Sequence, residues 1–235
     1  MADTILVPLE LPDPEPLSPV LIEDLSSLNV VVLGHYDLPE QTPARSASEQ
    51  FGEEAQASLD EIAEQFADAG ASVRTRLVFG KDRATAIRQV AEEEDCVAEL
   101  DPAPTDDIRR ILVPVPPAAE VTRLPTFISL LSEDSTQQIT LFHVAEGDVS
   151  RAEADELVTE IRDQLVDDGF DPTAVDTRVV EGEEHDDEIL RVADEYDAVV
   201  MYEAESRLSD RLFGTLPDRI ANETRDPVIV VRRDY

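Results

Sequence analysis

The sequence of 235 residues, at 26.0 kDa, is long enough for two domains of ordinary size. Apolar residues make up 42% of it, which is enough to bury a sizeable core and excludes general disorder. Fifty-four Asp and Glu residues face 19 Lys and Arg residues, for a formal net charge of -35. A protein this acidic is repelled by nucleic-acid backbones and by anionic membrane surfaces, so we expect neither as a partner.

The sequence shows no recognisable targeting signal and contains one cysteine. No apolar stretch approaches the roughly 18 to 20 residues that span a bilayer, and the start of the chain lacks the basic segment of a signal peptide. We therefore expect a soluble, cytoplasmic protein. Cys96 is the only cysteine, which excludes an internal disulfide, and its neighbours are typical of a buried strand rather than of a reactive thiol.

The acidic residues are spread along the whole chain, and Lys81 is the only lysine among the 19 basic residues. At low salt, charges of one sign at this density oppose the compact state, whereas at about 1 M salt the screening length falls to roughly 3 Å. The composition therefore favours a protein adapted to a salt-rich cytoplasm. An acidic protein from an ordinary cell is the alternative.

An internal repeat organises the chain. Three blocks recur in the same order, at offsets of 106, 108 and 102 residues: Ile5–Leu9 as Ile111–Val115, the strand ending at His35 as the one ending at His143, and Ala86–Leu100 as Glu188–Tyr202. Offsets that drift so little indicate two duplicated domains with changes in their loops. We place the boundary in the polar, proline-containing segment 101–107, which gives domains at 1–104 and 105–235.

Continuous apolar runs predict buried strands in the first half, and apolar residues spaced by three and four predict helices. The predicted elements, in chain order, are a strand Thr4–Leu9, a short helix Leu17–Leu28, a strand Asn29–Gly34, a long helix Ser46–Ala69, a strand Val73–Phe79, a helix Arg83–Glu94 and a strand Cys96–Leu100.

The second half repeats this order and adds two elements. We predict strands at Arg110–Val115, Gln138–Val144, Ala174–Val180 and Ala198–Met201, with helices at Leu124–Ser132, Ala152–Asp168 and Asp186–Glu195 between them, and then a helix Leu216–Thr224 and a last strand Pro227–Arg232. Apolar strands that alternate with amphipathic helices imply a parallel sheet covered on both faces. The sequence thus predicts two doubly wound α/β domains in tandem, the first one helix and one strand short.

Several segments of the second half resemble the universal stress protein family: ILVPV, the long helix closed by Gly169, the strand closing on Gly182, the run ILRVADEYDAVVM, and the ending from Leu212 to Arg232. In the first half the resemblance extends from Ile5 to about Leu100. It implies a tandem member whose complete domain has a five-stranded parallel sheet of the Rossmann-like, adenine-nucleotide alpha-hydrolase-like type.

Some members of that family bind ATP, through an acidic residue after the ILVP segment and a glycine-rich loop after the fourth strand. Such a loop needs glycines because backbone N–H groups must approach phosphate closely. In this chain Glu10 keeps the acidic position in the first half, whereas Pro116 replaces it in the second. Tyr202 and Glu205 stand where the two loop glycines belong.

Only Gly214 and Thr215 survive from the loop, with Arg207 and Arg211 nearby. Since neither half has both parts of the nucleotide site, the resemblance predicts that ATP is not bound in the usual way. If a nucleotide is bound, Glu10, Gly214 and Thr215 are the candidate residues. No catalytic or metal-binding residue is predicted, because the sequence contains no nucleophile with a base at recognisable spacing and no metal-binding motif.

Three histidines are the remaining candidates. His35 and His143 occupy equivalent positions in the repeat, which favours shared packing or a hydrogen bond to the backbone over catalysis. His185 lies among carboxylates at the start of a helix, where an acidic turn favours the positive helix end, and a metal site with its acidic neighbours is the alternative.

The resemblance implies a non-enzymatic regulatory protein of the stress response. An ATP-binding sensor or slow ATPase that uses the Gly214 and Thr215 remnant is one alternative, and an interaction subunit for a transporter or another protein is a second. The two halves are expected to pack as a pseudo-dimer. Pro227–Arg232 is expected to form an exposed edge strand that pairs with a second molecule, so we predict a homodimer through this strand.

Overall fold

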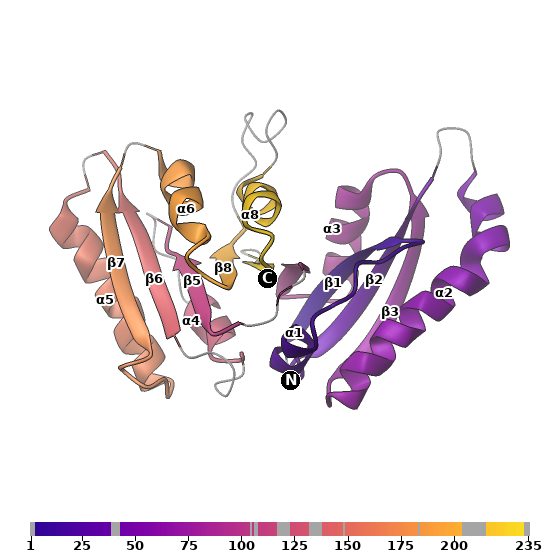
Figure 1. Cartoon of the computed structure of the whole chain (residues 1–235), viewed down its shortest axis with the longest axis horizontal. Helices are drawn as coiled ribbons and strands as arrows, with labels where there is room; N and C mark the ends of the chain where they lie inside the picture. Colours follow the sequence, from indigo (N-terminus) through magenta and orange to yellow (C-terminus); the bar gives the residue numbers. More distant parts are fainter. Residues whose placement is uncertain are drawn as a thin grey trace.

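The computed structural model describes residues 3–38, 43–103, 105, 108–116, 123–131, 138–147, 149–182, 184–203 and 215–232. Its strands form one nine-stranded sheet in the order β3-β2-β1-β4-β9-β8-β5-β6-β7 (Figure 1). The strand order within each half is the same when it is followed from the centre of the sheet to its edge: β4-β1-β2-β3 in the first half and β8-β5-β6-β7 in the second. Helices cover both faces, which confirms the predicted α/β architecture.

The first half follows the predicted order of elements. They are β1 (Thr4–Leu11), α1 (Pro19–Asp24), β2 (Asn29–Asp37), α2 (Ala44–Asp68), β3 (Ser72–Gly80), α3 (Arg83–Glu93) and β4 (Ala98–Asp101). Strand β1 is buried at seven of its eight positions, as its apolar run requires. Helix α1 is shorter than predicted, and Pro19 stands in its first turn, where a missing N–H costs nothing. Cys96 precedes β4 and is fully buried.

The second half repeats the first and extends it. Its elements are β5 (Arg110–Pro114), α4 (Arg123–Ile128), β6 (Gln138–Ala145), α5 (Arg151–Asp167), β7 (Val175–Glu181), α6 (His185–Ala193), β8 (Ala198–Tyr202), α8 (Leu216–Thr224) and β9 (Val228–Val231). In the described residues the first half has no counterpart of α8 and β9.

The two faces of the sheet are packed differently. Helices α1, α2, α4 and α5 cover one face over a single apolar core that runs through both halves. On the opposite face the core is divided in two: α3 packs over β1 and β2 around Leu6 and Val31, and α6 and α8 pack over the second half around Leu112 and Phe142. Between these two clusters the described residues leave a strip over the middle strands of the sheet, bordered by α8, which contacts β9 and β4.

Strand β9 joins the halves. It runs parallel to β8 and antiparallel to β4, with Val230 opposite Glu99 and Val231 opposite Ala98. It therefore completes the sheet of the first half as well as its own. The expectation that the last strand is an exposed edge awaiting a second molecule is wrong, because both of its edges are filled within the chain. The outer edges of the sheet are β3 and β7.

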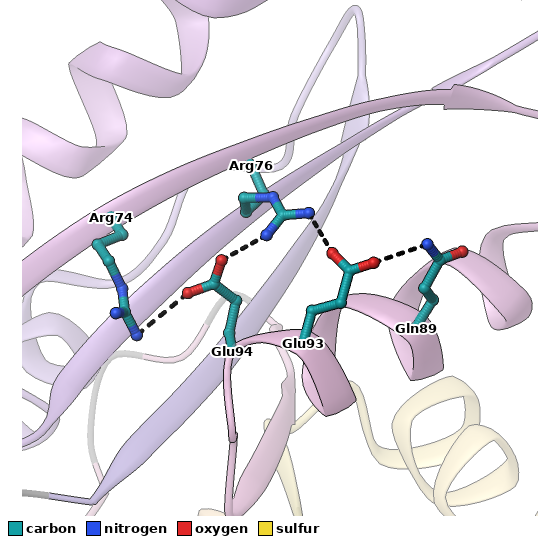
Figure 2. A network of polar contacts seen from close by, with 5 residues as sticks. All are labelled: Arg74, Arg76, Gln89, Glu93 and Glu94. Atoms are coloured by element: carbon teal, nitrogen blue, oxygen red, sulfur yellow. Dashed lines mark hydrogen bonds and ion pairs between the residues drawn. The ribbon is translucent and has the colours of Figure 1, made fainter.

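A repeated ion pair ties each of these edge strands to the helix that follows it. Arg76 on β3 contacts Glu93 at 2.5 Å and also pairs with Glu94, which Arg74 reaches at 3.2 Å, while Gln89 donates to Glu93 (Figure 2). In the second half Arg178 on β7 contacts Glu195 at 3.0 Å. Both arginine–glutamate pairs are separated by 17 residues, so the repeat extends to side-chain contacts.

Candidate functional site

A cavity of about 750 Å³ lies in the strip over the middle strands of the sheet, between α3 and α8. Its walls are the first turns of α3, α6 and α8, and its floor is formed by side chains of the central strands. The carboxyl ends of parallel strands and the amino ends of the helices after them are the usual place for ligands in this architecture. The floor includes Glu99 and Asp101 of β4, Met201 of β8, and Val230 and Arg232 at β9.

The missing helix of the first half explains why the cavity is there. In the second half α8 covers the sheet beside α6, through Leu216 and Ile220. No described helix takes the equivalent place beside α3 (Figure 1). Alternate residues of a strand face opposite sides of the sheet, so Ala98 and Leu100 enter the continuous core while Glu99 and Asp101 face the gap.

Burial raises the pKa of Glu99 and of Asp101. For Glu99 the nearby Arg232 opposes this rise and Glu203 adds to it; for Asp101 the guanidinium of Arg83 opposes it and Asp218 adds to it. Neither carboxylate forms a hydrogen bond or close ion pair with another residue in the part of the chain that the structure describes. The floor therefore holds two half-buried acids whose charges are stabilised only at a distance.

These two acids were missed by the sequence reasoning. The signal was present in the repeat, because the strand register gives Glu99 the position of Val199 in the second half, and Asp101 that of Met201. An acid at a site that is apolar in the equivalent strand indicates a different environment, but its meaning depends on which helix covers the strand.

The arginines that border the cavity are turned toward backbone carbonyls. Arg83 donates to the carbonyl oxygen of Pro8 at 3.4 Å, and Arg232 donates to that of Cys96 at 3.3 Å. The Arg83 Nε atom also lies 3.7 Å from the carboxylate of Glu10. These contacts hold both guanidinium groups at the rim, and the Glu10 carboxylate partly offsets the charge of Arg83.

Tyr202 occupies the position at which other members of the family have the first glycine of the loop. Its side chain is 6% exposed and belongs to the continuous core, and its hydroxyl accepts a hydrogen bond of 2.7 Å from the backbone N–H of Leu124. A glycine there would leave the space open beside α4. Glu205 and Gly214, the other altered and retained loop positions, lie outside the described residues.

Thr215 lines the cavity, but its polar groups are already used. It is the N-cap of α8, and its hydroxyl and backbone N–H both donate to the Asp218 carboxylate, at 2.6 Å and 2.9 Å. The carboxylate thus occupies the positive end of the helix, where a phosphate would otherwise bind. Thr215 therefore lies at the cavity in a capping role.

Glu10 and Pro116 lie at equivalent strand ends in the two halves. Glu10 is exposed on β1, beside Arg83, and does not line the cavity, whereas Pro116 does. The structure therefore does not bring Glu10 and Thr215 into one site. The acid that would contact the nucleoside, Glu10, and the hydroxyl at the phosphate position, that of Thr215, therefore belong to different halves.

The histidines lie in three different environments. His143 is 1% exposed and its Nδ1 lies 2.8 Å from the carbonyl oxygen of Val115, so the predicted backbone contact is confirmed for this residue. His35 is also buried, and burial together with the nearby Arg83 lowers its pKa. His185 lines the cavity 3.5 Å from Asp186, and no group of three or more potential metal ligands occurs among the described residues.

Comparison with known proteins gives one clear family match. Residues 107–232 match the model of the universal stress protein family. The chain belongs to that family. A search of curated proteins finds no significant match. The helices of the described part include none long and apolar enough to cross a bilayer.

Solved structures share the fold of the whole chain. A universal stress protein from Archaeoglobus fulgidus DSM 4304 superposes with a TM-score of 0.67 at 14% identity, over 98% of this chain and 96% of that one. A functionally unknown protein from Pseudomonas aeruginosa PAO1 gives 0.51 at 16% identity, over 99% and 93%. The cytoplasmic domain of a prokaryotic cation chloride cotransporter gives 0.51 at 11% identity, over 98% and 95%.

Proposed function

We propose that this universal stress protein is a tandem, non-enzymatic regulator of the stress response that does not bind ATP in the family's usual way. Membership of the family supports a stress-response role. The repeated strand order and the matching Arg76–Glu93 and Arg178–Glu195 pairs support the tandem arrangement, with the halves at 1–104 and 105–235. We place the protein in the cytoplasm, as the sequence suggests.

The buried Tyr202 carries the nucleotide part of this proposal. Its ring fills the position of a loop glycine, and its hydroxyl is engaged by Leu124. The Asp218 carboxylate already caps the helix that would hold phosphate, and Pro116 offers no acid for a nucleoside hydroxyl. A phosphate placed there would meet a carboxylate of the same sign in a partly desolvated site, which is repulsive.

The experiment is extraction of small molecules from protein purified in molar salt, followed by mass spectrometry and by ATP titration. We expect no stoichiometric adenine nucleotide and no response to millimolar ATP. Thr215→Ala should leave this result unchanged and only weaken α8, because the hydroxyl acts as a cap. Stoichiometric nucleotide that is lost in Thr215→Ala would contradict the proposal and favour the ATP-binding sensor or slow ATPase.

The burial and protonation of Cys96, the only cysteine of the sequence, support the non-enzymatic part of the proposal. Cys96 is fully buried, and burial raises its pKa to about 12, so it carries no thiolate at neutral pH. The hydroxyl of Thr215, which lines the cavity, is engaged by the Asp218 carboxylate in the cap of α8. Incubation with ATP and with ester substrates should release no product above the buffer rate.

A protein-binding role is the second candidate. The net charge of -35 gives the protein a strongly acidic surface, which steers cationic surfaces toward it. The fold shared with the cytoplasmic domain of a cotransporter makes a transporter one partner to test. Co-purification of one protein that survives molar salt would support this candidate, and loss of every partner at molar salt would contradict it. A homodimer also remains to be tested, through a surface other than β9.

A further inference from the structure

The cavity floor has a feature that belongs to this chain and goes beyond the question of nucleotide binding. Glu99 and Asp101 are two residues apart on β4, so they project from the same face with about 6.6 Å between their Cα atoms. Both face a space of about 750 Å³. Neither has a hydrogen-bond donor or close cation among the described residues.

The charges around the floor favour a cation there. Among the described residues, six acidic side chains line the cavity against three arginines: Glu99, Asp101, Glu146, Asp186, Glu203 and Asp218 against Arg83, Arg88 and Arg232. Arg83 and Arg232 are held toward Pro8 and Cys96, away from a direct contact with the two floor acids. A half-buried carboxylate that lacks a partner is unfavourable, and a cation that enters the cavity relieves both at once.

The other walls limit the shape of the occupant. Ile87, Met201 and Val230 give apolar surface beside the acids, and Ala84 leaves room at the first turn of α3. A bare metal ion does not fit this arrangement, because the described residues contain no group of three potential ligands. An organic molecule with an apolar middle and charged ends matches the combination of apolar wall and paired acids.

We propose that the β4 side of the cavity binds a small organic dication, a short chain with an ammonium group at each end, through the carboxylates of Glu99 and Asp101. The apolar chain lies over Met201 and Val230. In the described residues the first half has no helix of its own beside α3, so the site is a property of the tandem chain and not of a single domain.

The test is isothermal titration calorimetry of the full-length protein with 1,4-diaminobutane, at the lowest salt at which the protein stays folded. We expect saturable one-to-one binding with a Kd of about 1 mM or tighter. 4-Aminobutyrate, which has the same length but one carboxylate, should bind at least about tenfold more weakly, because it places an anion against an acid. Equal binding of the two compounds would contradict the proposal.

Two kinds of variant separate the site from general attraction to an acidic protein. The double variant Glu99→Gln/Asp101→Asn should lose at least about tenfold in affinity. Its matched control, Glu64→Gln/Glu156→Gln, removes the same charge from exposed positions of α2 and α5 and should bind within about twofold of the original. Equal losses in both would show non-specific attraction and overturn the proposal.

A second variant keeps the test valid if the floor substitutions disturb folding. Ala84→Phe fills the cavity from the exposed side of α3 and leaves both carboxylates in place. It should also lose at least about tenfold in affinity for the diamine. Full binding by a folded Ala84→Phe protein, or no binding by the original protein up to about 10 mM, would overturn the proposal.

Discussion

The hydroxyl of Tyr202 accepts a 2.7 Å hydrogen bond from the backbone N–H of Leu124, and so joins the end of β8 to the first turn of α4. The first N–H groups of a helix have no partner within it, and Leu124 is fully buried. The tyrosine therefore does two things at one position. It fills the space of a loop glycine and supplies an acceptor that a helix start requires.

Replacing Tyr202 by Phe should destabilise the protein by about 1–3 kcal/mol, because the Leu124 N–H is left buried without an acceptor. Urea unfolding in molar salt measures the change. Tyr36→Phe is the control, since Tyr36 stacks between Phe51 and Phe79 and its hydroxyl has no hydrogen bond to another described residue. A loss at Tyr36 as large as that at Tyr202 would contradict the role given to the hydroxyl.

Glu99→Gln should stabilise the protein at neutral pH, and the gain should vanish in acid. Burial raises the pKa of this carboxyl in the folded state, so the folded protein holds a proton more tightly than the unfolded chain does. The ionised form is then unfavourable at pH values above the folded pKa, and the unfavourable contribution disappears as pH falls toward the unfolded value.

Urea unfolding of Glu99→Gln and of the original protein, at neutral pH and near pH 4, measures this difference. Glu64→Gln, on the exposed face of α2, serves as the control and should change little at either pH. A gain of the same size at both pH values would show that packing, and not ionisation of Glu99, causes the effect. A stabilising change at a cavity floor is also what a binding site predicts.

Periodicity and the repeat predicted nearly all elements within a few residues, because buried strands and amphipathic helices have distinct patterns. The pattern of Val228–Val231 showed a strand but not its neighbours, since pairing depends on which other edge is free. The free edge was β4, left open by the missing strand of the first half, and it lies within the same chain. The cavity could not be predicted for the same reason, because it depends on which helices cover the central strands, and the described part of the first half has no counterpart of α8.

We propose that the high acidity is an adaptation to salt, and the stability of the protein should then rise steeply with ionic strength. At a net charge of -35, screening by about 1–2 M KCl should add several kcal/mol, which corresponds to a rise in Tm on the order of 10 °C for a chain of this size. Thermal unfolding followed by circular dichroism measures it.

Sucrose separates screening from a general stabilising effect of solutes, because it strengthens burial without shielding charge. At matched osmolarity it should raise the Tm by less than half as much as KCl does. A protein equally stable in dilute buffer and in molar KCl would indicate an ordinary acidic protein, the alternative reading of its composition.

Removing β9 should promote association and not abolish it. A chain that ends at Asp226 loses the strand that fills the gap between β4 and β8, and it exposes two hydrogen-bonding edges together with the buried side chains around Ile229. Light scattering in molar salt should show dimers or larger species, at a higher fraction than in the full-length protein. A chain that ends at Arg232 keeps β9 and serves as the control, and it should behave like the full-length protein. A full-length dimer that the shorter chain converts to monomer would instead restore the last strand as an intermolecular contact, and the pairing of Val230 with Glu99 would have to be exchanged between molecules.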